Sequence, residues 1–176
     1  MTFARDASDS YLRDWTYGAT GGIVSTTIIL AAVVGADLPN SIALMLGLAN
    51  LAAIGFATAA RKYSNIKSAQ NIHRFGRTDL NADIRSSAQT ALSVFVAFVR
   101  SGLIPLVTCL LIPGEPTIWM ITTVCTLFAI GSAKSSNSLS PWWRSGLDTV
   151  FLGMCAAALA FAVAHSAQSL IGIWTH

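Results

Sequence analysis

A long run of uncharged residues near the start of the chain, 15–36, constrains the fold more than any other feature. A helix needs about 20 apolar residues to cross a hydrocarbon core of about 30 Å, and this run is long enough. It is rich in small residues, and Gly18 and Gly22 have the spacing at which two helix backbones approach closely in a membrane. We therefore expect a membrane helix at the centre of a bundle, with Gly18 and Gly22 at a helix-packing or dimer contact.

The rest of the chain is equally apolar. Of its 176 residues, 53% are hydrophobic and 11% are charged, whereas a soluble domain carries about 25% charged residues. The predicted fold class is an all-α, multi-pass integral membrane protein with a polar cytoplasmic N-terminal segment, 1–14, and one transmembrane domain, 15–174. Five transmembrane helices are expected in that domain, at residues 15–36, 41–60, 90–112, 117–133 and 141–174.

The basic residues predict the orientation, because cytoplasmic loops of membrane proteins are enriched in Lys and Arg. Apart from Arg100, every Lys and Arg lies in the N-terminal segment, in the loop 61–88, or near the start of the fifth span. The turns at 37–40 and 113–116 contain none. We therefore expect the N-terminus in the cytoplasm, the C-terminus outside it, and 61–88 as a short cytoplasmic loop between the second and third spans.

Several other functional classes have no support in the sequence. No basic run is long enough to follow a nucleic acid backbone, so the expected partner is the lipid bilayer and not a nucleic acid. The three cysteines lie in apolar segments without a CxxC spacing, which favours packing residues over disulfides. No nucleophile–base pair, phosphate-binding glycine loop or zinc-protease motif is present. We therefore expect neither an enzyme nor a resident cofactor.

Short motifs on all five expected spans occur in an order that resembles the vacuolar iron transporter family of Fe(II) and Mn(II) exporters. An Arg-Asp pair precedes a glycine-rich run on the first span, and a small-residue run followed by a tyrosine ends the second. The third has Gly-x-x-Pro, the fourth Phe-x-x-Gly-x-x-Lys, and the fifth Trp-x-x-Ser-Gly-Leu-Asp. These motifs begin at Arg13, Ala57, Gly102, Phe128 and Trp142.

Three positions depart from the pattern of that family. The aspartate of its first span, a ligand on the translocation path, falls on Gly21. The methionine near the end of its second span falls on Thr58, and the glutamate that follows falls on Lys62. The glutamate-rich helices of eukaryotic members are also absent, because 61–88 contains no Glu. The chain therefore resembles a divergent member that lacks the usual metal ligands.

The resemblance implies a transporter that moves divalent iron or manganese out of the cytoplasm, as a homodimer with the first span at the dimer axis. A second hypothesis is a non-transporting member of the fold, which acts as a structural or assembly subunit of a larger membrane complex. The retained motifs favour the first hypothesis. The missing ligands and the charge of Arg100 favour the second.

Asp14 and Asp148 lie at the expected cytoplasmic ends of the first and fifth spans, and both match acidic positions of the family. Carboxylates at that depth are costly unless they are paired or functional. Their hard oxygens suit Fe(II) or Mn(II), so one hypothesis is a gate for metal or protons. The alternative is that each carboxylate stabilises the start of its helix through the macrodipole, with Asp14 paired to Arg13 or Arg144.

A second set of candidate metal ligands lies in the 61–88 loop. Asp79 and Asp83 are four residues apart, and His73 precedes them, so one helical face and a nearby imidazole could hold a divalent ion. The alternative is a pair of ordinary surface carboxylates.

Arg100 lies near the middle of the third expected span. A charge at that depth costs about 3 kcal/mol on insertion scales. We expect a buried charge with a structural or subunit-interface role, or else a role on the transport path, where it would repel a metal cation.

Overall fold

The structure is a computed structural model that describes residues 2–72, 80–112, 116–134 and 142–174. Side chains are described for 12–68, 87–112, 117–133 and 142–170. Over these residues the expected all-α fold is confirmed. The described helices are α1 (Thr2–Gly35), α2 (Asn40–Ile72), α3 (Leu80–Leu111), α4 (Pro116–Lys134) and α5 (Trp142–Trp174).

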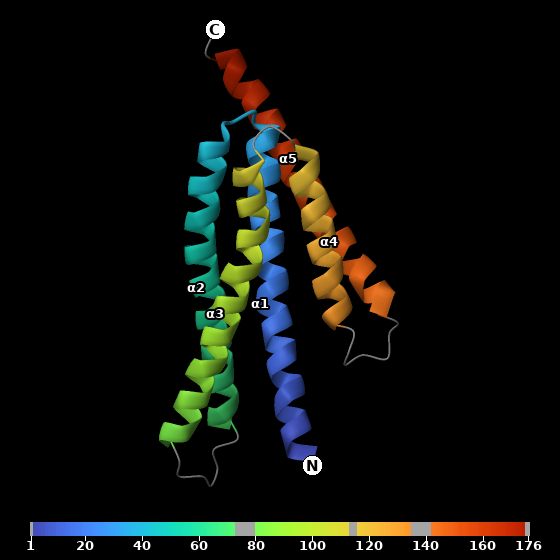
Figure 1. Ribbon diagram of the computed structural model, residues 1–176. Coiled ribbons are helices and arrows are strands. Elements are labelled where there is room, and N and C mark those ends of the chain that lie inside the picture. Colours follow the sequence, from blue (N-terminus) through green and yellow to red (C-terminus); the bar gives the residue numbers. More distant parts are fainter. Residues whose placement is uncertain (1, 73–79, 113–115, 135–141, 175–176) are drawn as a thin grey trace.

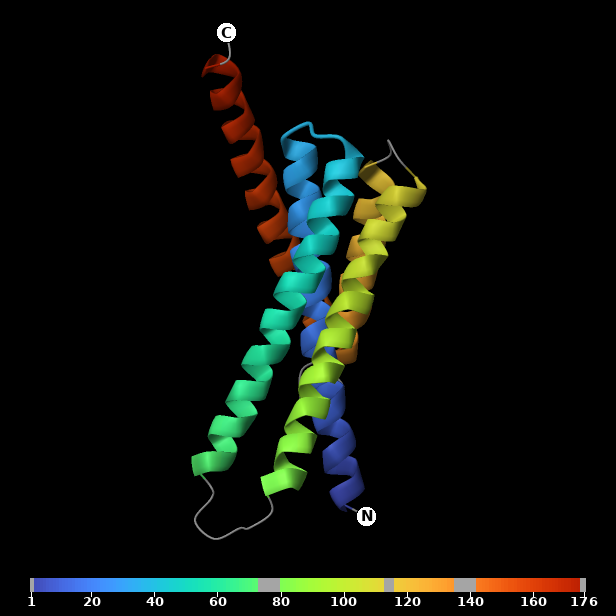
Figure 2. The same ribbon diagram turned by 90° about the vertical axis from the view of Figure 1, so that its left-hand side faces the viewer.

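α1 runs through the middle of the bundle, with α2 and α3 on one side and α4 and α5 on the other (Figure 1). The starts of α1, α3 and α5 and the ends of α2 and α4 lie toward one end of the bundle, called here the N-terminal end. The C-terminal part of α5 diverges from the other helices at the opposite end (Figure 2). The path of the chain therefore alternates between the two ends.

Four of the described helices contain stretches long and apolar enough to cross a membrane. The remaining described helix, α4, has a shorter apolar stretch, Thr117–Ala133. At 1.5 Å per residue that stretch is about 25 Å long, slightly less than a typical hydrocarbon core. The full count of five spans and the orientation remain predictions. The four long stretches are Leu12–Gly35, Asn40–Ser68, Ser87–Leu111 and Trp142–Leu170.

The helices extend well beyond the expected span ends. α1 begins at Thr2, inside the segment 1–14, and α2 and α3 occupy most of the expected loop 61–88, since α2 ends at Ile72 and α3 begins at Leu80. The reason is that polarity by itself does not end a helix. The extension of α2 contains Lys, Arg, Ala and Gln, which are good helix formers, and it contains neither Gly nor Pro.

Small residues let α1 and α3 pack at close range. A Cβ added to Gly18 would lie 2.5 Å from the backbone oxygen of Val94, and one added to Gly22 would collide with that of Phe98. The Ser101 hydroxyl on α3 donates a hydrogen bond of 2.7 Å to the backbone oxygen of Ala19 on α1. The close approach at Gly18 and Gly22 therefore joins two helices of one chain.

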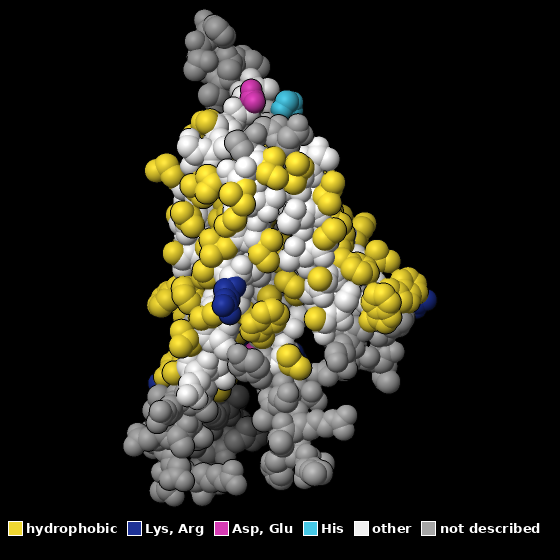
Figure 3. Space-filling view, viewed as in Figure 1, with side chains coloured by type: hydrophobic (Ala, Val, Ile, Leu, Met, Phe, Trp, Pro, Cys, Tyr) yellow, Lys and Arg dark blue, Asp and Glu magenta, His cyan; other side chains and the backbone are white. Residues whose placement is uncertain are grey.

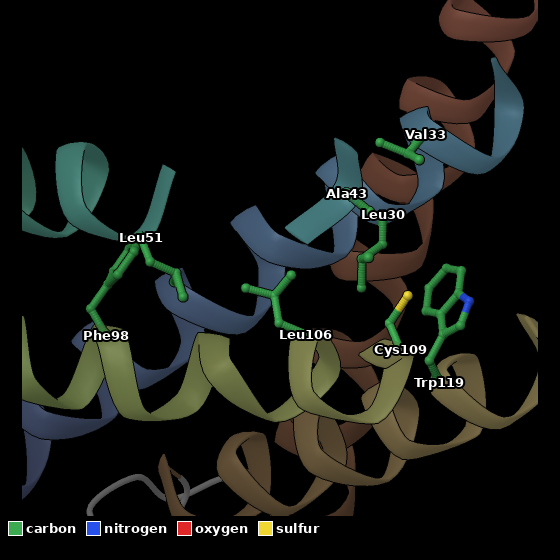
Figure 4. Close-up of a cluster of buried hydrophobic side chains, with 8 residues drawn as sticks. All are labelled: Leu30, Val33, Ala43, Leu51, Phe98, Leu106, Cys109 and Trp119. Atoms are coloured by element: carbon green, nitrogen blue, oxygen red, sulfur yellow. The ribbon is translucent and has the colours of Figure 1, made fainter. Parts of the chain in front are cut away.

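The hydrophobic core is formed where the first four helices meet (Figure 4). Phe98 and Leu106 of α3 pack with Leu51 of α2, and Trp119 of α4 joins the same cluster. The buried members are Leu30, Val33, Ala43, Leu51, Phe98, Leu106, Cys109 and Trp119.

Many large apolar side chains lie on the outside of the bundle. Phe151, Leu152 and Leu159 of α5 are each 68% exposed, and Figure 3 shows hydrophobic side chains spread over the face in view. A surface of this kind suits lipid, and with the apolar stretches it identifies a multi-pass membrane protein.

Candidate functional site

A groove runs along α1 between α2 and α5. It has a volume of about 550 Å³. α1 provides most of the lining, α2 provides Ile54 and Thr58, and the groove is open to the outside of the chain on one face. Its lining residues are Arg13, Thr16, Tyr17, Thr20, Gly21, Val24, Ile54, Thr58, Phe98, Thr149, Leu152 and Gly153.

The polar atoms of the groove are mainly threonine hydroxyls. Thr16 donates to the backbone oxygen of Leu12 at 2.7 Å, and Thr58 donates to that of Ile54 at 2.7 Å. Because each hydroxyl uses its proton within its own helix, its oxygen lone pairs remain available to a ligand. Among its described lining residues the groove therefore presents neutral oxygens and the Arg13 guanidinium, and no carboxylate.

At the N-terminal end the groove joins a smaller and more polar cavity of about 310 Å³, which we call the mouth pocket. The two share Arg13, Tyr17 and Thr58. α1 and α2 provide its described walls. The mouth pocket is lined by Arg13, Asp14, Tyr17, Thr58, Arg61, Lys62 and Asn65.

An ion pair crosses the mouth pocket. The Lys62 ammonium on α2 donates to Oδ1 of Asp14 on α1 at 2.6 Å. The Asp14 side chain is 9% exposed and that of Lys62 is 27% exposed. Asp14 lies one helical turn before Gly18, where α1 is closely packed, so its carboxylate is held among neighbouring helices. The partner of Asp14 is therefore Lys62, and not Arg13 or Arg144 as the alternative interpretation supposed.

The three positions that depart from the family pattern meet in these cavities. Gly21 and Thr58 line the groove, and Thr58 and Lys62 line the mouth pocket. The sequence resemblance placed ligands of the transported metal at these positions. The geometry thus brings together positions that lie on two different helices, although their side chains here are a hydrogen, a hydroxyl and an ammonium group.

Asp148 lies apart from this site. It is exposed on α5, and it lines neither the groove nor the mouth pocket, although its neighbour Thr149 lines the groove. The other candidate ligands are not placed. His73 and Asp79 lie outside the described residues, and Asp83 lies in α3 with its side chain outside the described set.

No group of three or more His, Cys, Asp or Glu side chains with the proximity of a metal site occurs among the described residues. A third cavity, of about 300 Å³, lies nearer the opposite end, between α1, α4 and α5. Its walls are almost wholly apolar and include Met120 and Met154. The oxygen donors of the described cavities are therefore concentrated in the groove and the mouth pocket.

Arg100 was expected to be buried, and this was wrong for the single chain. Its side chain is exposed on α3, on the same face as Val96 and Ile104, which are 42% and 40% exposed. The buried face of α3 is instead formed by residues such as Phe98 and Ser101. Arg100 therefore faces whatever surrounds the bundle and does not line the groove.

Sequence reasoning missed Lys62 as part of the site. It treated Lys62 only as a lost glutamate and did not ask what the new charge contacts. The available signal was that the basic residue Lys62 stands where the family has a glutamate, which changes the sign of the charge that can face Asp14. A carboxylate that loses an acidic neighbour and gains a basic one will form an ion pair if the two side chains can meet.

Comparison with known proteins gives consistent matches. A model of the VIT family matches residues 12–87 and 69–165. Over 89 residues the chain is 36% identical to "Vacuolar iron transporter 1" of Arabidopsis thaliana, and over 90 residues it is 31% identical to "Vacuolar iron transporter 1" of Eucalyptus grandis. A "Vacuolar iron transporter" of Centaurea cyanus is 34% identical over 91 residues.

Each of these matches covers only part of this chain and only part of the relative. Each covers 49% of this chain and 36% or 37% of the relative. The chain therefore matches about a third of the length of these curated relatives.

Proposed function

The chain belongs to the VIT family, and we propose that it is a membrane transporter that moves Fe(II) or Mn(II) out of the cytoplasm. The resemblance identified from the five sequence motifs is thereby confirmed at the level of the family. One observation carries the functional proposal. Gly21 of α1 and Thr58 and Lys62 of α2 match metal-ligand positions of the family, and they line the groove or the adjoining mouth pocket.

In this proposal the groove is the path of the ion. Neutral threonine oxygens line it, and the Asp14 carboxylate stands at its N-terminal end. Hydroxyl and carboxylate oxygens are hard donors, which suit Mn(II) and Fe(II). Because Lys62 holds Asp14, the ion has to displace the ammonium group before it reaches the carboxylate. Asp148, which is exposed near the start of α5, provides a second carboxylate at that end of the bundle among the side chains that the structure describes.

We further propose that the transporter is a homodimer. The groove is open along α1, so a second copy placed against α1 would enclose it and complete the path. An enclosed path excludes lipid from the polar threonine and glycine surface. The contact between α1 and α3 at Gly18 and Gly22 lies inside one chain, so a dimer has to use the groove face of α1 instead.

A second candidate function is a structural or assembly subunit of a membrane complex, without transport. The ion pair between Asp14 and Lys62 favours it, because a fixed ammonium group already occupies the carboxylate. The described lining of the mouth pocket also carries three basic side chains and one carboxylate, and this charge opposes the approach of a divalent cation.

The two candidates are separated by uptake of Mn(II) or Fe(II) into proteoliposomes. We expect wild type to take up the ion, and we expect Asp14→Asn and Asp148→Asn to abolish uptake because each removes a charged oxygen ligand. Asp37→Asn is a matched control, since Asp37 lies in the connection between α1 and α2 at the opposite end. Equal uptake by wild type, the variants and empty liposomes would instead support the structural-subunit function.

A further inference from the structure

The mouth pocket has the charge of an anion site. Among the residues whose side chains the structure describes, Arg13, Arg61 and Lys62 line it together with one carboxylate, Asp14, so the formal charge of this described lining is +2. The pocket also contains neutral hydrogen-bond donors, the hydroxyl of Tyr17 and the side-chain amide of Asn65. Such a lining attracts a negatively charged group.

The ion pair in the pocket leaves the two arginines available. Lys62 and Asp14 neutralise each other at 2.6 Å. Arg13 and Arg61 are exposed, and among the residues whose side chains the structure describes neither has a carboxylate within salt-bridge distance. A guanidinium presents its N–H groups as a planar fork, which matches the oxygens of a phosphoryl group.

Aromatic residues at the pocket favour a position at the level of lipid headgroups, where phosphoryl groups are abundant. Arg13 and Asp14 directly precede Trp15, and Tyr17 lines the pocket itself. Tryptophan and tyrosine gather at the level of lipid headgroups. The volume of about 310 Å³ is about ten times the share of one water molecule in the liquid, so a phosphoryl group fits.

We propose that the mouth pocket binds a phosphoryl anion, held mainly by Arg13 and Arg61, with Tyr17 and Asn65 as additional donors. The phosphoryl group belongs either to the headgroup of an anionic phospholipid or to free phosphate. The groups that hold the anion are different from the threonine and Asp14 oxygens of the proposed transport path, although both lie at the mouth pocket, so the two proposals can be tested separately.

The test measures binding to the full chain purified in an uncharged detergent. Short-chain phosphatidic acid, phosphatidylcholine of the same chain length and inorganic phosphate are titrated separately, and bound species are counted by native mass spectrometry. Each arginine near a membrane surface contributes about fivefold in affinity for an anionic lipid. We therefore expect Arg13→Gln and Arg61→Gln each to weaken binding of the phosphoryl ligand about fivefold, and the double variant about 25-fold.

Arg144→Gln is the matched control. Arg144 is exposed at the same end of the bundle, but it lies over the ring of Trp143 at 5.2 Å and does not line the pocket. Its loss should change binding less than twofold. Zwitterionic phosphatidylcholine should bind more weakly than phosphatidic acid, and an unchanged unfolding midpoint in detergent shows that each variant is folded. If the double variant does not fold, the two single variants provide the test.

The results distinguish the two sources of the ligand. Binding of phosphatidic acid that inorganic phosphate does not displace indicates a lipid headgroup, and binding of inorganic phosphate that the arginine variants lose indicates the free anion. The proposal is overturned if neither ligand binds, if the arginine variants bind as wild type does, or if Arg144→Gln weakens binding equally. Metal uptake is measured in a separate experiment, so failure of one proposal is not failure of the other.

Discussion

α1 and α5 are both long apolar helices, but the bundle encloses them to very different degrees. In the most apolar stretch of each, 56% of the residues of α1 are buried and only 17% of those of α5. α1 brings small residues against its neighbours, whereas α5 exposes Phe151, Leu152 and Leu159. In lipid the apolar character of a helix does not bury it, because the surrounding solvent is equally apolar. Close packing of small residues decides which helix becomes the axis.

The strongest test of this difference compares a glycine on each helix. Gly22→Leu should prevent normal packing of α1 on α3, because even a Cβ at Gly22 meets the backbone of Phe98 and would lie 2.6 Å from the Ser101 hydroxyl. We expect a loss of more than about 3 kcal/mol in the free energy of unfolding. Unfolding by a denaturing detergent, followed by tryptophan fluorescence, measures it.

Gly153→Leu on α5 is the comparison. A Cβ there meets the end of the Leu127 side chain at 2.8 Å and no backbone atom among its nearest contacts, and the end of a side chain shifts more easily than backbone does. We expect a smaller loss, about 1–2 kcal/mol. Equal losses at the two sites would show that α1 is not packed more tightly than α5.

The free energy of unfolding should depend more on the buried carboxylate of Asp14 on α1 than on the exposed carboxylate of Asp148 on α5. Lys62→Met leaves the Asp14 carboxylate buried without its partner, and we expect a loss of about 2 kcal/mol, moderated because Lys62 is 27% exposed. Asp14→Asn should cost less, since Lys62 can turn toward water. Asp148→Asn on α5 should change the free energy of unfolding by less than about 0.5 kcal/mol.

A double-mutant cycle on Asp14 and Lys62 isolates the pair. The coupling energy between Asp14→Asn and Lys62→Met should be favourable and of order 1 kcal/mol. A coupling energy of zero, or a loss at Asp148→Asn as large as that at Lys62→Met, would contradict the difference in burial.

Truncation of one apolar side chain on each helix compares the packing of α1 and α5 on a smaller energy scale. Ile23 of α1 is fully buried, and Leu159 of α5 is 68% exposed. In a membrane the cost of truncation is mainly lost packing, because the hydrophobic effect contributes little between helices. We expect Ile23→Ala to cost about 1–2 kcal/mol and Leu159→Ala to cost almost nothing in the same unfolding assay. A large effect at Leu159 would indicate that a second copy or another protein covers α5.

The sequence predicted which segments are helical, four of which are long and apolar enough to cross a membrane, and it predicted close approach at Gly18 and Gly22. Both depend on local composition, namely apolar length and the spacing of small residues. The ends of the helices were harder to predict, because the polar extension of α2 to Ile72 consists of helix formers and is interrupted by neither Gly nor Pro.

The contacts within the site could not be predicted from any single segment of the chain. The pairing of Asp14 with Lys62 joins residues 48 positions apart, and it depends on how α1 and α2 are turned toward each other. The face on which Arg100 lies could not be predicted either. α3 is as apolar on its outward face, at Val96 and Ile104, as on its buried face, so no periodicity distinguishes the two.

Substitution of Arg100 on α3 should have the smallest effect on the free energy of unfolding of the isolated chain. It extends the comparison of buried and exposed positions from α1 and α5 to α3. Its side chain is exposed, so Arg100→Leu should change the free energy of unfolding in detergent by less than about 0.5 kcal/mol, as should Ile104→Leu on the same face. In the bilayer the two variants should differ. Leucine at the centre of a span is favoured over arginine by about 3 kcal/mol, so the segment Ser87–Leu111 alone should insert more completely with Arg100→Leu than with Ile104→Leu.

The oligomer measured in native membranes then decides what the arginine contacts. If Arg100 pairs with a carboxylate of another subunit, Arg100→Leu should weaken the assembly by about 2 kcal/mol or more, because the partner charge is left unpaired in the membrane, while Ile104→Leu leaves it intact. If assembly, transport and insertion all match those of wild type, Arg100 reaches water, and the membrane then lies at a different height on α3 from the one that the sequence predicts.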